Sequence, residues 1–278
     1  MFRSLLFAPG NVARRVEKAL QLNADAVILD LEDSVPIAEK GATRELIAEA
    51  LRAPRNRPCY VRVNALSTGL TVGDLAAIVS SHLDGIVLAK SERAVDLIKV
   101  DWYLSHLEKE RSLPIGSIDL IPLVENAAGV CNAYEIAKSV ARVRRLCFGA
   151  IDYTTDINVQ LTEGGVEIFY ARSHLVNASA AAELEPPIDT VYPEIKNLSG
   201  LLADAGVGRK LGFQGKLVIH PAQIEPVNEV FSPSQEEIAY AERVVAAFKE
   251  AEAAGHAAIT LDNGKFIDYP VARNAERL

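Results

Sequence analysis

Several features that mark particular classes of protein are missing from this sequence. No apolar run is long enough to span a membrane, and the first ten residues do not form a signal-peptide pattern. Basic residues, 29 in number, are fewer than the 37 acidic residues, and the formal net charge of −8 argues against a nucleic-acid surface. We therefore expect a cytoplasmic protein that binds neither membranes nor nucleic acid.

Cysteine is scarce as well. Cys59, Cys131 and Cys147 are odd in number and show no CxxC spacing, so we expect small buried hydrophobic residues in a reducing compartment. No GxGxxG motif follows any predicted strand, which argues against a dinucleotide-binding sheet.

Short apolar runs alternate with segments of helical spacing over residues 1–230. The eight predicted strands are Ser4–Ala8, Ala26–Leu31, Cys59–Asn64, Gly85–Lys90, Asp119–Val124, Arg145–Phe148, Ile188–Tyr192 and Lys216–His220. The predicted helices are Val12–Leu22, Pro36–Leu51, Gly73–Ser81, Glu92–Glu110, one amphipathic segment before Arg145, Gly164–Glu183 and Leu198–Leu211. Eight alternations at this regular spacing predict a (β/α)8 TIM barrel, with a doubly wound open sheet as the alternative.

Residues 231–278 form an extension that a barrel does not need for closure. Pro233–Gly255 is strongly amphipathic, and Ser234 followed three residues later by Glu237 predicts a capping box. A turn at Asp262-Asn263-Gly264 and a short final helix follow. We expect this helical extension to pack on the barrel or on a neighbouring subunit.

Two of the predicted strands are each followed closely by a carboxylate, Glu125 and Asp152. In a parallel sheet connected by helices, residues just past the carboxyl ends of the strands face one crevice. Two carboxylates that meet there can hold a hard divalent cation. The alternative is that both residues only cap the helices that follow them, because acidic residues are favoured at helix N-termini.

Seven segments, taken together and in order, resemble one family. They are RSLLFAPG, AVILDLEDSV, YVRVN, LVENAAGV, FGAIDY, GFQGKLVIHPAQI and GKFIDYPV. The sequence is thereby similar to the citrate lyase β-subunit-like enzymes, including malyl-CoA and citramalyl-CoA lyases, of the HpcH/HpaI aldolase group. The resemblance runs over essentially the whole chain and implies a (β/α)8 barrel, in agreement with the strand count.

The resemblance also assigns roles to residues. It implies that Glu125 and Asp152 bind Mg²⁺, and that Arg62 and Ile151, together with Asp152, contact the substrate. Arg62 would meet a substrate carboxylate or a developing alkoxide, since a guanidinium pairs well with either. Asp268 matches an acid that acts in the active site of an adjacent subunit, where it would protonate the acyl-thioester enolate. Without the resemblance, the sequence also allows purely structural roles for two of these residues. Arg62 could form an ion pair with Asp30 or Glu32, and Asp268 could cap a helix.

Further residues complete the expected site. Asp30, Glu32 and Asp33 would orient Arg62 and metal-bound water. We interpret His220 as structural. Three basic residues follow the first strand, namely Arg14, Arg15 and Lys18. They would face either the phosphates of CoA or solvent.

The function that the resemblance implies is a Mg²⁺-dependent carbon–carbon lyase, which splits a 3-hydroxyacyl-CoA thioester into acetyl-CoA and a 2-oxo acid. Citramalyl-CoA, giving pyruvate, is the first expectation, followed by a citryl thioester and malyl-CoA. Departures from the family's usual residues at Ala89 and Asn126, and the segment Tyr153–Gly165 over the crevice, leave the 2-oxo acid open. We expect a stand-alone homo-oligomer, a trimer or hexamer.

Two other functions compete with this one. The first is a metal-dependent aldolase of free 4-hydroxy-2-oxo acids, against which the extension bearing Asp268 argues because it matches the CoA-using branch. The second is a non-catalytic binding protein or complex subunit, which loss of Glu125, Asp152 or Arg62 would have favoured; all three are present.

Overall fold

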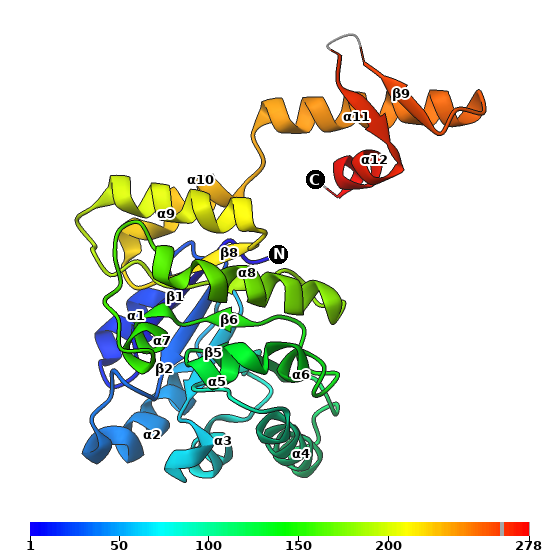
Figure 1. The fold of residues 1–278 in the computed structure, drawn as a ribbon. Helices are drawn as coiled ribbons and strands as arrows, with labels where there is room; N and C mark the ends of the chain where they lie inside the picture. Colours follow the sequence, from blue (N-terminus) through cyan, green and yellow to red (C-terminus); the bar gives the residue numbers. More distant parts are fainter. Residues whose placement is uncertain (262–263, 278) are drawn as a thin grey trace. The chain divides into compact units, whose positions relative to one another are not determined.

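Eight short parallel strands close into a barrel in chain order, as the spacing of the apolar runs predicts (Figure 1). The structure is a computed structural model that describes residues 1–261 and 264–277. It divides into two compact units, Met1–Phe231 and Ser232–Leu278. The strands are β1 (Ser4–Pro9), β2 (Ala26–Asp30), β3 (Cys59–Val63), β4 (Gly85–Leu88), β5 (Asp119–Val124), β6 (Cys147–Phe148), β7 (Ile188–Asp189) and β8 (Gly215–Val218). Pairing of β1 with β8 closes the barrel and excludes the open sheet.

Alternation along the strands produces two hydrophobic layers. Leu5, Ile28 and Tyr60 belong to the cluster that fills the barrel, whereas their neighbours Leu6 and Val27 belong to the larger cluster under the helices. Successive side chains on a strand point to opposite faces, so one face of each strand fills the interior and the other supports the helices.

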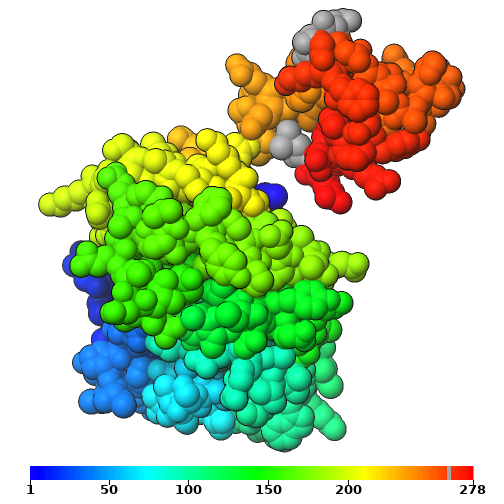
Figure 2. Space-filling view, in the orientation of Figure 1, coloured from blue at the N-terminus to red at the C-terminus, as the bar shows by residue number. Residues whose placement is uncertain are grey.

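Helices surround the strands in the order of the chain. They are α1 (Ala13–Leu20), α2 (Lys40–Ala50), α3 (Thr71–Ile78), α4 (Ala94–Glu110), α5 (Ala127–Cys131), α6 (Ala133–Ala137), α7 (Ala150–Asp156), α8 (Val166–Ala181), α9 (Leu198–Leu211) and α10 (Ile224–Phe231). Short 3₁₀ turns lie at Ile37–Glu39, Leu66–Thr68 and Pro221–Gln223. In the space-filling view, cyan, green and yellow segments follow one another across the barrel unit, as expected for helices that wind around it (Figure 2).

The region between β5 and β6 differs from the prediction of one helix. Two short helices, α5 and α6, meet at Asn132, whose side-chain amide donates to the Glu92 carbonyl at 2.9 Å. Asparagine is a weak helix former because its amide competes for such bonds. The segment Tyr153–Gly165, which we expected to lie over the crevice as a loop, begins in helix α7. Helix α10 was not predicted from the sequence.

The second unit contains a helix, a hairpin and a further helix. These are α11 (Gln235–Ala253), β9 (Ala258–Thr260), β10 (Phe266–Asp268) and α12 (Tyr269–Glu276). The capping box between Ser234 and Glu237 is present, with both reciprocal hydrogen bonds. The sequence did not predict β9 and β10, and residues 262–263 of the expected turn lie outside the described residues.

Cysteine burial agrees with the prediction at two of three positions. Cys59 and Cys147 are buried in β3 and β6, and burial raises the pKa of the Cys59 thiol to about 12. Cys131 is exposed at the end of α5, so the expectation of burial is wrong there. Among the described residues, no helix is both long enough and apolar enough to cross a membrane.

A buried ionic network joins β7 and β8 to the helices outside them. Asp189 of β7 accepts hydrogen bonds from Arg172 of α8 at 2.9 Å and from Lys216 of β8 at 3.0 Å. Asp204 of α9 accepts from the same two cations, at 2.7 and 2.6 Å. Both cationic side chains are at most 2% exposed, so this network is an integral part of the wall of the barrel.

Candidate functional site

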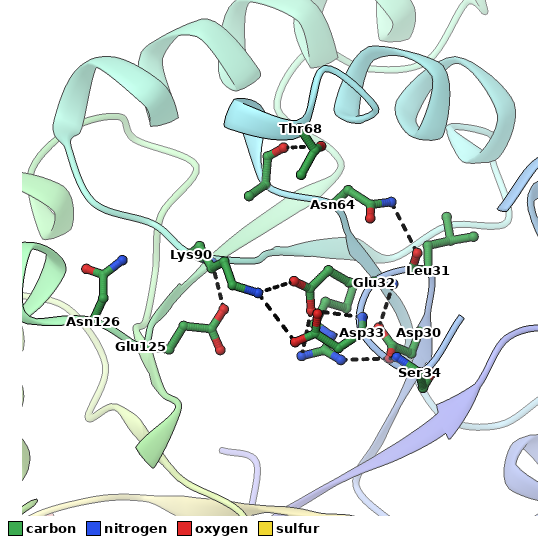
Figure 3. A network of polar contacts seen from close by, with 12 residues as sticks. Asp30, Leu31, Glu32, Asp33, Ser34, Asn64, Thr68, Lys90, Glu125 and Asn126 are labelled. Atoms are coloured by element: carbon green, nitrogen blue, oxygen red, sulfur yellow. Dashed lines mark hydrogen bonds and ion pairs between the residues drawn. The ribbon is translucent and has the colours of Figure 1, made fainter. Parts of the chain in front are cut away.

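The carboxyl ends of consecutive strands bring charged side chains together at one end of the barrel. Asp30 ends β2, Arg62 lies near the end of β3, and Lys90 and Glu125 follow β4 and β5. Asp152 follows β6, in the first turn of α7. Figure 3 shows Lys90 between Glu125 on one side and Glu32 and Asp33 on the other. The structure thus gathers residues that are far apart in the sequence.

Glu125 is held in place by main chain rather than by another side chain. It is 3% exposed, and its Oε1 accepts the Lys90 N–H at 2.7 Å. Burial raises the pKa of Glu125 to about 8; Arg62 opposes this rise, and Asp152 and Glu32 add to it. The helix that follows is capped by Asn126, whose Oδ1 accepts the Gly129 N–H, so Glu125 is not the cap.

The carboxylate of Asp152 has no protein partner among the residues that the structure describes. Within the described residues its carboxylate makes no hydrogen bond or ion pair, and it lines a cavity. Gly149 precedes α7 as the N-cap residue, and the Thr190 hydroxyl, not Asp152, accepts the first N–H of this helix at 2.8 Å. Glu125 and Asp152 follow the neighbouring strands β5 and β6, and the negative charge of Asp152 contributes to the raised pKa of Glu125.

Arg62 forms the ion pairs that the sequence left open. Its Nε and one terminal nitrogen donate to the two oxygens of Asp30 at 2.6 and 2.7 Å, and its other terminal nitrogen lies 3.1 Å from Glu32. Its guanidinium carbon lies 5.0 Å from the centre of the Phe7 ring. Burial lowers the pKa of Arg62, but the bonds and charges of Asp30, followed by Glu32 and Glu125, outweigh it and raise this pKa overall.

The loop after β2 is fixed by a lysine that the sequence analysis did not single out. Lys40 is buried, and its ammonium donates to the carbonyls of Leu31 and Glu32 and to Asn64 Oδ1, at 2.7, 2.9 and 2.7 Å. Asp30 also accepts the N–H groups of Glu32 and Ser34. These bonds set the direction in which Glu32 points, toward Arg62 and Lys90.

The balance of charge at this end of the barrel suits a divalent cation. Arg62 and Lys90 pair with Asp30, Glu32 and Asp33, whereas within the described residues neither Glu125 nor Asp152 pairs with a cationic side chain. Among the described residues, no group of three or more His, Cys, Asp or Glu is arranged as a metal site. Two carboxylate ligands fit Mg²⁺, which keeps several waters and takes further oxygens from substrate. A bound cation would also favour the ionised form of Glu125.

A cavity of about 780 Å³ lies beside these charges. The predicted residues that line it are Arg15, Lys18, Asp30, Asp33, Arg62, Ile151, Asp152 and His220. Arg14 is exposed and is not in its lining. Much of the remaining wall is apolar, with Leu6, Phe7, Leu22, Val191 and Ile195 among its residues. Charged groups beside an apolar wall form the usual composition of a small-molecule site.

His220 and Asp268 both have structural partners. His220 Nδ1 accepts the Ala222 N–H at 3.2 Å and caps the 3₁₀ turn Pro221–Gln223, although the residue also lines the cavity. Asp268 is in the second unit, where its Oδ1 accepts the Val271 N–H at 3.1 Å and caps α12. The capping role that the sequence left open for Asp268 is therefore present.

Substitution of Gly149 by Ala is expected to displace Glu125. A Cβ at this position would lie 2.7 Å from both Cβ and Oε2 of Glu125, so the carboxylate must move. We expect the Mg²⁺ affinity to fall by about 10- to 100-fold, the usual loss when the support of a metal ligand is removed. Isothermal titration calorimetry with MgCl₂ measures this change.

Gly164→Ala is the matched control, because nothing lies within 4 Å of a Cβ there. Its Mg²⁺ affinity should equal that of the wild type. Equal affinities for the Gly149 and Gly164 variants would contradict the assignment of Glu125 as a metal ligand.

Comparison with known proteins places this geometry in context. The HpcH/HpaI aldolase/citrate lyase family matches residues 3–221. Citrate lyase subunit beta from Leuconostoc mesenteroides subsp. cremoris is 36% identical over 278 residues, which cover 99% of this chain and 91% of the relative. Citramalyl-CoA lyase, mitochondrial, from Homo sapiens is 34% identical over 99% of this chain and 83% of its own. The crystal structure of protein CitE from Mycobacterium tuberculosis, in complex with magnesium, acetoacetate and coenzyme A, matches with a TM-score of 0.81 and 30% identity, covering 99% of this chain and 96% of that one.

Proposed function

Because the chain belongs to the HpcH/HpaI aldolase/citrate lyase family, we propose that it is a magnesium-dependent carbon–carbon lyase that cleaves a 3-hydroxyacyl-CoA thioester. Citramalyl-CoA is the first proposed substrate, and a citryl thioester and malyl-CoA are the next. The observation that carries the proposal is the cavity with an apolar wall that Arg62 and Asp152 line, at the strand ends where Glu125 also lies.

The proposed reaction breaks the bond between C2 and C3 of the acyl group. In citramalyl-CoA, the hydroxyl on C3 gives its proton to water as C3 becomes the carbonyl carbon of pyruvate. The electron pair of the broken bond forms the enolate of acetyl-CoA, which then gains a proton on carbon. Bound Mg²⁺ would supply Lewis-acid chemistry to the carboxylate and hydroxyl end of the substrate.

The residues of this chain divide the remaining work. Glu125 and Asp152 would hold the cation, and Arg62, oriented by Asp30 and Glu32, would stabilise negative charge on the departing 2-oxo acid. Ile151 and the apolar wall would contact the acyl group. Arg15 and Lys18 line the same cavity and are exposed, so they would meet the phosphates of CoA.

Asp268 would donate the proton to the enolate from a second copy of the chain. The unit that carries it, Ser232–Leu278, has a small core of buried apolar residues, namely Val244, Phe248, Ile267 and Ala272. Units shorter than about 70–80 residues rarely stabilise themselves with such a core. Phe266 and Tyr269 are also 62% and 42% exposed. A homo-oligomer, a trimer or hexamer, would cover these residues.

The test of this function is a cleavage assay with citramalyl-CoA, malyl-CoA and citryl-CoA, with Mg²⁺ or with EDTA. The 2-oxo acid and acetyl-CoA are both quantified, because release of free CoA without a 2-oxo acid would indicate thioester hydrolysis instead. We expect equal amounts of the two products and no turnover in EDTA. Cleavage of free 4-hydroxy-2-oxo acids alone would favour the aldolase, and no cleavage would favour a binding protein.

Two variants of Asp268 separate catalysis from capping in the same assay. Asn is a good N-cap residue, so Asp268→Asn keeps the cap of α12 and removes the acid, whereas Asp268→Ala removes both. We expect both variants to lose about 100-fold or more in kcat. Full activity of Asp268→Asn would show that capping is its only role.

A further inference from the structure

Lys90 adopts a backbone conformation that lysine rarely uses. It lies two residues past the end of β4 and has a φ of 49°, in the left-handed region that favours glycine. Residues held in such conformations cluster at functional sites, where the surrounding structure over-determines them. The contacts of Lys90 show what holds it there.

The first contact is made by the main chain. In this conformation the Lys90 N–H points at Glu125 and donates to its Oε1 at 2.7 Å. It is the only hydrogen bond that the described residues make to the Glu125 carboxylate. The conformation of Lys90 therefore fixes the direction of a proposed metal ligand.

The second contact is made by the ammonium. Lys90 Nζ lies 2.5 Å from Glu32 Oε1 and 3.3 Å from Asp33 Oδ2 (Figure 3). The other oxygen of Glu32, Oε2, lies 3.1 Å from Arg62. Glu32 is thus held between two cations, with Lys90 at one oxygen of its carboxylate and Arg62 at the other.

We propose that Lys90 is a positioning residue that couples the two halves of the site: its N–H orients Glu125 toward the cation, and its ammonium holds Glu32 against Arg62. This proposal rests on the function proposed above. One residue thereby aligns the metal ligand with the guanidinium that meets the substrate, across the ends of β3, β4 and β5.

A direct role in substrate binding would have a different kinetic signature. The side chain is 36% exposed, so its ammonium is accessible to solvent. If the Lys90 ammonium bound the substrate, removing the ammonium would raise KM. Removing a positioning residue instead lowers kcat with little change in KM. The two roles are therefore separable by steady-state kinetics.

Lys90→Gly and Lys90→Val test the main-chain contact as a matched pair. Both lack the ammonium, but glycine adopts positive φ freely, whereas the β-branched valine strongly disfavours it. Lys90→Ala is the intermediate variant, which is used if Lys90→Val does not fold by circular dichroism. We expect the Mg²⁺ dissociation constant, measured by isothermal titration calorimetry, to be at least about tenfold weaker for Val than for Gly.

The ammonium is tested with Lys90→Gly and Lys90→Arg in the cleavage assay. We expect Lys90→Gly to lower kcat by about 10- to 100-fold with KM changed by less than about threefold. Lys90→Arg, which can pair with Glu32 and Asp33, should recover kcat to within about tenfold of wild type.

Each outcome decides part of the proposal. Equal Mg²⁺ affinities for the Gly variant and for the Val or Ala variant would overturn the role of the N–H. Wild-type kcat in Lys90→Gly, or a raised KM at unchanged kcat, would overturn the role of the ammonium. If the wild type cleaves no thioester, the proposed function fails, while the calorimetric comparison still decides whether Lys90 orients Glu125.

Discussion

Replacing Glu125 with Gln should lower kcat for thioester cleavage by about a thousandfold, because a metal ion that acts as a Lewis acid contributes several kcal/mol to transition-state stabilisation. The substitution preserves shape and can still accept the Lys90 N–H, so the barrel should stay folded. It removes the negative charge with which Glu125 would bind the cation. Steady-state kinetics over a range of Mg²⁺ concentrations, with thermal unfolding in Mg²⁺ and in EDTA, measures both effects.

Glu92→Gln is the matched control for this substitution. Glu92 lies at the same end of the barrel, where its carboxylate accepts from Asn126 at 2.8 Å, and an amide oxygen would still accept this bond. Its kcat and its stabilisation by Mg²⁺ should match those of the wild type. If Glu125→Gln retained wild-type stabilisation by Mg²⁺, the cation would have to bind elsewhere.

Asp189→Ala should lower the free energy of unfolding by about 3–5 kcal/mol, the usual cost of removing one partner from a buried ion pair. Arg172 and Lys216 are 2% and 0% exposed and would then share Asp204 alone. Neither cation can reach water without opening the wall between β7 and β8. Urea denaturation measures the loss, and urea is preferred because guanidinium chloride screens charges.

A surface ion pair provides the comparison for the buried network. Glu49 and Arg52 form a pair at 2.9 Å in which both side chains are at least 67% exposed. Glu49→Ala should change the free energy of unfolding by less than about 1 kcal/mol, because solvent screens such pairs. A cost for Asp189→Ala as small as this would mean that solvent reaches the network.

The barrel was predictable because its signal is periodic. Each buried strand is a short apolar run, and each run is separated from the next by a segment with helical spacing, which a parallel barrel requires. The ends of the strands were predicted less accurately. Strand β7 ends at Asp189 rather than at Tyr192, and β8 ends at Val218 rather than at His220. The apolar runs there continue past the last ladder hydrogen bond, so composition alone does not show where pairing stops.

Other elements gave no periodic signal. The hairpin of β9 and β10 has three residues in each strand, and Phe266 is exposed while Ile267 is buried. Segments this short are too brief for an alternation to stand out. The break at Asn132 depends on a bond to a distant carbonyl, which the local sequence does not contain.

Within the site, position along the strand was the useful signal. Glu125 and Asp152 were predicted because residues at strand ends in a parallel barrel face one crevice. Arg62 was predicted from the resemblance, which also gave all three residues their roles. Lys90 and Lys40 were not assigned roles. Part of the proposed role of Lys90 depends on a backbone angle, and Lys40 binds mainly carbonyl groups of the main chain. The types of side chain in the sequence show neither feature.

The barrel is uneven around its circumference, and this has a consequence for its motions. The strands β6 and β7 have two residues each and share a single register pair, Cys147 with Ile188. Amide hydrogens along this seam should exchange through local opening at a lower free energy than those of β1 and β2, which share five pairs. Asp152 stands directly beyond the seam, in α7. A ligand that binds both Glu125 and Asp152 ties β6, one side of this seam, to β5. Binding of such a ligand is therefore thermodynamically linked to any opening of the seam that displaces β6 and α7.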